Sequence, residues 1–100
     1  MARYFSHTVI LPDESRLDDF IVEVVAGTVS YYPFIGEVHS TVYVEGGILL
    51  SYRDDLQGKT VTLGQLSWAM GSAGDGILCA YALSPCPSCM GDRYVLSRLG

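Results

Sequence analysis

The residues of this chain best suited to chemistry are its three cysteines, which gather toward the C-terminus. Cys86 and Cys89 form a C-x-x-C pair, a spacing at which two thiolates can bind one zinc ion from a tight turn. Cys79 would be a third ligand, with His7 or His39 as the fourth. Structural zinc modules usually present a second ligand pair, which this sequence lacks. We therefore expect no cofactor, and zinc binding is the alternative hypothesis.

The same C-x-x-C pair also resembles a thiol-disulfide redox motif, in which a thiolate at a helix N-terminus has a lowered pKa. Thioredoxin-like folds place that motif after their first strand, whereas only eleven residues follow Cys89. A proline-stiffened loop with two incidental thiols is the simpler interpretation. The odd number of cysteines, in a chain without a recognisable export signal, favours reduced thiols and a cytoplasmic location.

A cluster of carboxylates lies in the first quarter of the chain, at Asp13, Glu14, Asp18, Asp19 and Glu23. The whole chain carries a net charge of −5, which opposes direct contact with nucleic-acid phosphates or an anionic membrane. The apolar runs are also far shorter than the roughly 20 residues that cross a bilayer. The cluster is either a solvated surface or a docking face for a larger protein with a basic surface.

Aromatic side chains gather in a second segment, where Tyr31, Tyr32 and Phe34 surround Pro33. Rigid aromatic side chains are common anchors of protein interfaces. The alternative is that they cover one end of the core. We include all three with the acidic cluster as candidate partner-binding residues.

Two types of periodicity predict the elements that position these residues. Residues 3–11 are aromatic and β-branched, which predicts a first strand. Apolar residues at helical spacing, followed by Gly27, predict a helix over residues 14–26. A buried strand over residues 20–25 is the competing interpretation, because β-branched residues lower helix propensity. Residues 28–36, interrupted by Pro33, suit an irregular or edge segment.

The second half of the chain predicts a hairpin, a short helix and one or two strands. Residues 37–44 and 48–53 alternate in polarity around Gly46 and Gly47, as in two strands joined by a tight turn. Thr62 begins a capping-box pattern that predicts a second helix as far as Met70. Residues 77–83 have the length of a buried strand, and residues 93–99 suit a last strand or a helical turn.

A chain of 100 residues with 49% apolar residues is enough for one core, so we expect a single domain over residues 1–100. The element order is then β-α-β-β-α-β, which is the ferredoxin-like arrangement. The sequence predicts an α+β fold, in which two helices cover one face of an antiparallel sheet. A homodimer through an exposed hairpin edge over residues 37–44 is chemically easy.

This compact acidic profile without a catalytic constellation resembles that of small phage-encoded or mobile-element inhibitors, including anti-CRISPR proteins. The resemblance is one of composition and involves no sequence motif. It implies a non-enzymatic protein-binding module that blocks a surface of a larger partner. We expect that function, with a small zinc-stabilised structural domain as the alternative.

Overall fold

The computed structural model describes residues 2–36, 41–62, 64, 76–86 and 93–99. Within these residues the chain forms eight strands and no helix. The expected α+β fold is therefore wrong, and the described part of the domain is all β. The strands are β1 (Ala2–Ile10), β2 (Arg16–Val25), β3 (Thr28–Pro33), β4 (Thr41–Tyr43), β5 (Ile48–Ser51), β6 (Thr60–Thr62), β7 (Cys79–Pro85) and β8 (Arg93–Arg98).

The strands form one mixed sheet in the order β3-β2-β1-β5-β7-β8-β6, with β4 also paired to β1. β4 lies parallel to the first half of β1, and β5 lies parallel to its second half. The predicted hairpin around Gly46 and Gly47 is thus wrong. Its two strands follow one another along the same edge of β1, and the glycines belong to the connection between them.

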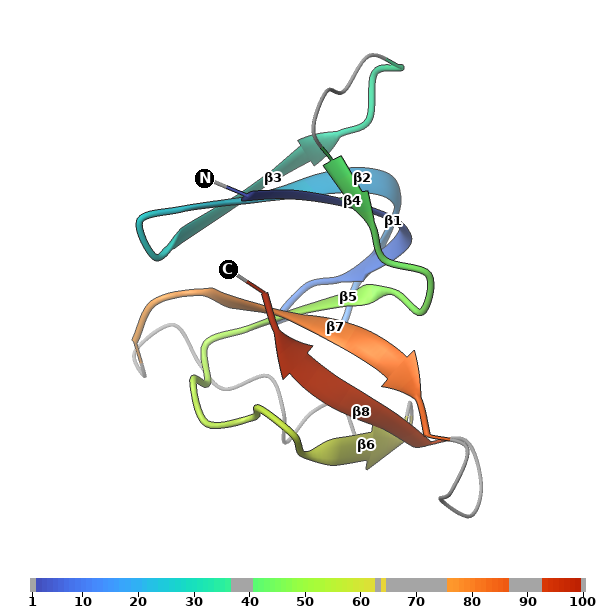
Figure 1. Ribbon diagram of the computed structural model, residues 1–100, viewed down its shortest axis with the longest axis vertical. Coiled ribbons are helices and arrows are strands. Elements are labelled where there is room, and N and C mark those ends of the chain that lie inside the picture. The colour runs from blue at the N-terminus through green and yellow to red at the C-terminus, as the bar shows by residue number, and fades with distance from the viewer. Residues whose placement is uncertain (1, 37–40, 63, 65–75, 87–92, 100) are drawn as a thin grey trace.

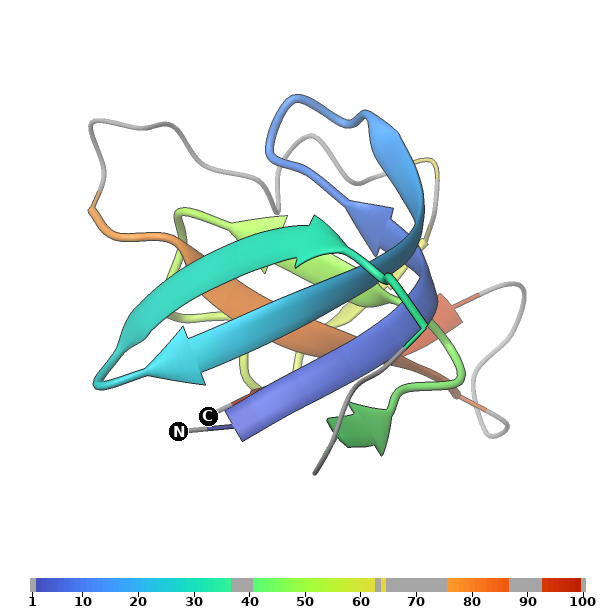
Figure 2. The ribbon, with the colours of Figure 1, turned by 90° about the horizontal axis from the view of Figure 1, so that it is seen from above.

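The sheet folds over on itself into two layers (Figure 1). β1, β2, β3 and β4 form the upper layer in this view, and β5, β6, β7 and β8 form the lower layer. Seen from above, the strands of the upper layer cross over those of the lower one (Figure 2). β1 belongs to both layers, because its second half pairs with β5.

A kink in the β1–β2 pair allows this fold. Tyr4 and Val9 of β1 pack in the same core cluster, although strict alternation would place them on opposite faces. The same holds for Leu17 and Phe20 of β2. Asp19 lies between these two residues and has a φ of 56°, a left-handed conformation that aspartate tolerates better than most residues. The strand pair therefore swivels at Asp19, so that residues from both of its halves, Tyr4 with Val9 and Phe20 with Leu17, contribute to the same cluster.

Two hydrophobic clusters lie on opposite faces of β5 and β7. One fills the space between the layers and contains Val9, Val22, Ile48, Leu50 and Ala80. The other lies within the lower layer and contains Ile10, Leu49, Leu56, Val61, Cys79, Tyr81, Leu83 and Leu96. All four residues of β5 are buried, because each of its faces contacts a cluster. The first cluster holds the two layers together, and the second packs the strands of the lower layer against one another.

The predicted first helix is wrong, because the kinked strand β2 has apolar residues at the spacing that is typical of a helix. Residues 16–25 form β2, and both Ile21 and Val22 are fully buried, on opposite faces of the strand. Burial on both faces, added to the swivel at Asp19, gives apolar residues at intervals of three and four. Gly27, which was expected to end the helix, instead forms a two-residue turn with Ala26, and both have positive φ. This geometry is that of a type I′ hairpin turn.

The predicted second helix lies almost entirely outside the described residues. Thr62, its expected cap, is the last residue of β6. The expected strands over residues 3–11 and 77–83 are confirmed as β1 and β7, and residues 93–99 contain β8 rather than a helical turn. Among the described residues there is no helix long and apolar enough to span a membrane.

Candidate functional site

The outer face of the upper layer carries a row of large side chains from four neighbouring strands. The register places Phe5 of β1 beside Ile21 of β2, and Ile21 beside Tyr32 of β3. On the other side Phe5 is paired with Tyr43 of β4. Residues directly opposite in a sheet project from the same face, so the four side chains form one row. Ile21, in the middle, is fully buried.

Two further rings extend this row. The ring of Phe34, which follows β3, lies 4.7 Å from that of Phe5, measured between centroids. The ring of His7 lies 5.2 Å from Phe5 and 5.6 Å from Tyr43, both edge-on. Tyr43 is 52% exposed and Phe34 is 40% exposed. We define the aromatic surface as Phe5, His7, Tyr32, Phe34 and Tyr43.

Charged groups border the aromatic surface on one side. Arg3 Nε donates to Glu23 Oε2 over 2.8 Å, and the Tyr32 hydroxyl donates to the same oxygen over 3.2 Å. The hydrogen bond from Arg3 lowers the pKa of Glu23, and the bond to Glu23 raises the pKa of Arg3. Partial burial, followed by the bond to Glu23, raises the pKa of Tyr32. Glu23 therefore stays ionised at neutral pH and fixes Tyr32 in its orientation.

A second carboxylate lies at the kink. His7 Nδ1 is 2.5 Å from Asp19 Oδ1, and both side chains are more than half exposed. The register pairs Ser6 with Phe20 and Thr8 with Asp18, so His7 and Asp19 lie between two paired positions, where Asp19 has a left-handed conformation. The Asp19 carbonyl accepts a hydrogen bond from the Phe34 amide, which positions Phe34 next to Phe5. The kink that folds the sheet thus also assembles one end of the aromatic surface.

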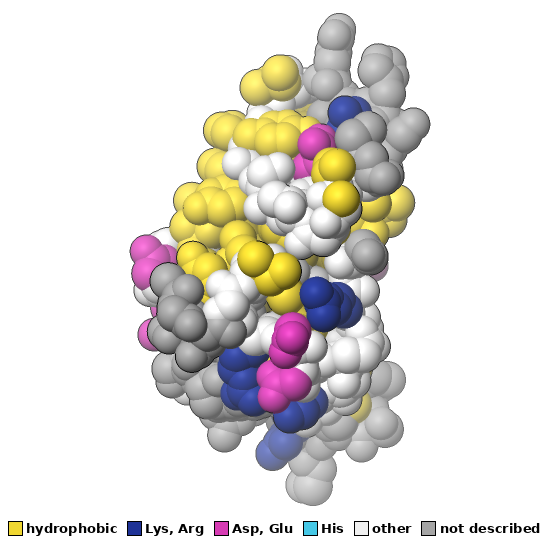
Figure 3. Space-filling model, turned by 90° about the vertical axis from the view of Figure 1, so that its left-hand side faces the viewer, with side chains coloured by type: hydrophobic (Ala, Val, Ile, Leu, Met, Phe, Trp, Pro, Cys, Tyr) yellow, Lys and Arg dark blue, Asp and Glu magenta, His cyan; other side chains and the backbone are white. Residues whose placement is uncertain are grey.

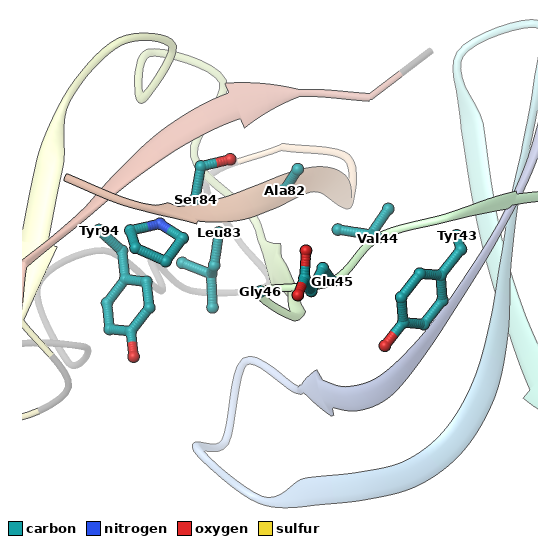
Figure 4. Close-up of a pocket in the computed structure, with 9 residues that line it drawn as sticks. Tyr43, Val44, Glu45, Gly46, Ala82, Leu83, Ser84 and Tyr94 are labelled. Atoms are coloured by element: carbon teal, nitrogen blue, oxygen red, sulfur yellow. The ribbon is translucent and has the colours of Figure 1, made fainter. Parts of the chain in front are cut away.

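A pocket of about 640 Å³ adjoins the aromatic surface at Tyr43. Tyr43 and Tyr94 lie at opposite ends of it, with Glu45 and Leu83 between them (Figure 4). The pocket is lined by the end of β4 and the connection that follows it, by β7 and by Tyr94 of β8. Gly46 makes this arrangement possible, because a Cβ atom at this position would lie 1.8 Å from the Leu83 carbonyl oxygen. The walls of the pocket consist mainly of backbone atoms and apolar side chains.

The structure distributes the predicted acidic cluster over several places. Asp13 and Glu14 lie in the turn between β1 and β2, where hydrogen bonds from Ser15 lower the pKa of Asp13. Asp18 lies opposite Thr8, on the far side of the kink from Phe5. Asp19 and Glu23 border the aromatic surface. The cluster is therefore not one helix face, and only two of its members accompany the aromatic side chains.

The predicted aromatic residues are also divided. Tyr32 and Phe34 belong to the aromatic surface. Tyr31 projects from the other face of β3, where its ring contacts that of Phe20 at 6.3 Å. One side of the molecule shows hydrophobic side chains gathered over its upper half and charged side chains over its lower half (Figure 3). Among the described residues, every exposed large apolar side chain except Ile77 belongs to β2, β3, β4 or the segment that follows β3.

The cysteines proposed as zinc ligands are not brought together where they are described. Cys79 begins β7, is buried in the lower cluster, and its thiol donates to the Ile77 carbonyl. Cys86 follows the other end of β7 and is disulfide-bonded, in contrast to the reduced thiols that we expected. Seven residues of extended strand separate them by about 23 Å, too far to share one metal ion. Cys89 and His39 lie outside the described residues, within which no group of metal-ligating side chains is found.

Sequence reasoning missed Phe5 and Tyr43 as site residues and considered His7 only as a metal ligand or a structural residue. The sequence did contain a signal for Phe5 and His7. Arg3, Phe5 and His7 alternate along the strand that was predicted over residues 3–11, so they were expected to share a face. The parallel pairing that brings Tyr43 beside Phe5 has no local sequence signal.

Comparisons with models of protein families, with curated proteins and with solved structures find no significant match to this chain.

Proposed function

We propose that this chain is a non-enzymatic protein-binding module whose aromatic surface docks onto a larger protein. The observation that carries the proposal is the row of Tyr43, Phe5 and Tyr32 on an outer sheet face, extended by Phe34. Soluble proteins rarely leave contiguous apolar patches exposed without use. Tyrosine in particular is enriched among residues that dominate binding energy.

The chemistry of the surface favours a basic partner. Asp19 supplies a carboxylate beside the aromatic rings, whereas that of Glu23 is already paired with Arg3, and the chain as a whole has a net charge of −5. Arginine and lysine side chains bind to such combinations, because the cation contacts an aromatic face while its charge meets a carboxylate. A complementary charge also accelerates the encounter of the two proteins. By occupying such a surface, a small protein can act as an inhibitor of its partner, in the way that the compositional resemblance to phage inhibitors implies.

The decisive experiment compares two substitutions that each remove a large, exposed apolar side chain. Tagged protein is used to capture its partner, the partner is purified, and the dissociation constant is measured for Tyr43→Ala and Ile77→Ala. Ile77 is 69% exposed but lies in the lower layer, just before β7, so it is the matched control. Loss of a binding anchor costs about 2 kcal/mol, so Tyr43→Ala should weaken binding roughly 30-fold. Ile77→Ala should leave it unchanged.

The charge preference is tested in the same assay with a second matched pair. Asp19→Asn removes a carboxylate beside the aromatic surface, and asparagine also tolerates the left-handed backbone at this position. Asp54→Asn removes the same charge from an exposed site between β5 and β6. Weaker binding of Asp19→Asn alone supports the proposal. Equal affinities for Tyr43→Ala, Ile77→Ala and the parent would refute it.

A further inference from the structure

β3 ends the sheet with an open strand edge. It is the first strand in the sheet order, and among the described residues it pairs only with β2. Five of its six residues are exposed. Edge strands are usually protected from pairing by charged side chains, especially lysine. The sequence of β3, TVSYYP, has no charged residue.

The register with β2 determines which backbone groups of β3 face β2. The Phe34 amide donates to the Asp19 carbonyl over 2.9 Å, so residue 34 occupies a hydrogen-bonded position. Such positions alternate along an antiparallel pair. The turn at Ala26 and Gly27 agrees with this pattern, because a two-residue hairpin turn is closed by a hydrogen-bonded pair. The residues of β3 that direct their amides toward β2 are therefore Thr28, Ser30 and Tyr32.

Val29, Tyr31 and Pro33 then direct their backbone groups toward the open edge. Val29 and Tyr31 offer an amide donor and a carbonyl acceptor each, and Pro33 offers only a carbonyl. Pro33 has no N–H group, but its nitrogen faces away from β2, so the β2–β3 pair loses no hydrogen bond. A proline is therefore accommodated at the end of this strand. The open edge therefore offers two amide donors, those of Val29 and Tyr31, and ends at Pro33.

We propose that this edge pairs with the same edge of a second copy of the chain, antiparallel, about a two-fold axis at Ser30. In this register Val29 lies opposite Tyr31 of the second copy, and both exchange their outward hydrogen bonds. Pro33 lies beyond this pair and is not required to donate. A register centred on Tyr31 is worse, because it places Pro33 opposite Val29 and leaves a carbonyl without its donor.

The composition of the edge favours a second copy as the occupant. Two chains of net charge −5 repel one another, but this edge brings no charged side chain of β3 against its equivalent. The cross-strand pairs are a β-branched residue with an aromatic one, a combination that stabilises antiparallel sheets. Pairing about an axis perpendicular to the sheet also places the two aromatic surfaces on one continuous face. The inference is independent of what binds that surface.

The first test is the oligomeric state, measured by sedimentation equilibrium for the parent and for Tyr31→Pro. Proline at position 31 removes an outward donor and leaves the hydrogen bonds to β2 in place. We expect the parent to sediment as a dimer, and Tyr31→Pro to sediment as a monomer with an unchanged circular dichroism spectrum. A parent that remains monomeric at all accessible concentrations overturns the proposal, as does a dimer that persists in folded Tyr31→Pro.

A second test does not depend on whether Tyr31→Pro folds. In the proposed register Ser30 faces Ser30 of the second copy at a non-hydrogen-bonded position, with Cα atoms about 4.5 Å apart. This separation is within the range of disulfides, so Ser30→Cys should cross-link the dimer under mild oxidation. Thr28→Cys is the control, because its equivalent in the second copy is about 13 Å away. Equal cross-linking of Ser30→Cys, Thr28→Cys and the parent would overturn the register.

Discussion

Replacement of Gly46 by alanine tests how the pocket and the fold depend on one close backbone approach. An added Cβ would lie 1.8 Å from the Leu83 carbonyl oxygen and 2.9 Å from its carbon. Ordinary contacts of this kind are about 3.5 Å, and the atoms it meets belong to the backbone of β7, so no side chain can rotate away. The connection from β4 to β5 must therefore move outward.

The cost of this movement follows from the contacts that it breaks. Overpacking a well-packed site usually costs about 1–3 kcal/mol. The Leu83 amide also donates to the Gly47 carbonyl over 2.9 Å, and loss of this bond adds about 1 kcal/mol. We expect Gly46→Ala to lower the free energy of unfolding by about 2–4 kcal/mol. For a domain of this size the melting temperature should then fall by about 10–25 °C.

The assay is urea and thermal unfolding of Gly46→Ala beside Gly64→Ala. Gly64 is the matched control, because among the residues that the structure describes a Cβ there meets only Thr62 Oγ1, at 4.0 Å, and its φ is not positive. Gly64→Ala should melt like the parent. If Gly46→Ala also melted like the parent, the close approach of the connection to β7 would not exist, and the geometry of the pocket would be wrong.

Three further predictions concern stability. Ala26→Asn should raise the free energy of unfolding by about 1 kcal/mol, because asparagine tolerates the left-handed turn conformation that alanine adopts at a φ of 50°; an unchanged urea midpoint would contradict this. Tyr81→Phe should lower it by about 1 kcal/mol in the same assay, because the buried Tyr81 hydroxyl donates to the Arg53 carbonyl over 2.6 Å. The third prediction concerns pH. The hydrogen bond from Arg3 lowers the pKa of Glu23, so the ionised carboxylate stabilises the fold at pH values above the unfolded-state pKa of Glu23. This contribution is lost as the pH falls through the lowered pKa of the folded state. Arg3→Gln should therefore lose less stability on acidification below about pH 5 than the parent, and parallel pH profiles would contradict this.

The sequence predicted strands well where burial follows simple alternation or a short apolar run. β1 and β7 have these patterns, and Pro33 correctly indicated an edge position for the segment that contains β3. β2 was mistaken for a helix because the swivel at Asp19 interrupts alternation, and because Ile21 is buried on the outer face. The competing strand over residues 20–25 was the better interpretation, consistent with its β-branched residues.

The sequence indicated where strands form better than it indicated which strands pair with one another. The Gly46-Gly47 pair has the local chemistry of a hairpin turn, yet here the glycines are required by the approach to β7 and by the passage of the chain along β1. Nothing in the sequence near Tyr43 indicates that it lies beside Phe5. The aromatic surface was therefore predicted only in part, through Tyr32 and Phe34, together with Asp19 and Glu23, which border it.

The most direct test of the aromatic surface as a docking site is NMR mapping of the isotope-labelled chain with its captured partner. We expect the largest changes in chemical shift at Phe5, Phe34 and Tyr43, and small ones at Ile77 and along β8. Binding confined to the lower layer, with the signals of Phe5, Phe34 and Tyr43 unchanged, would contradict the proposed function.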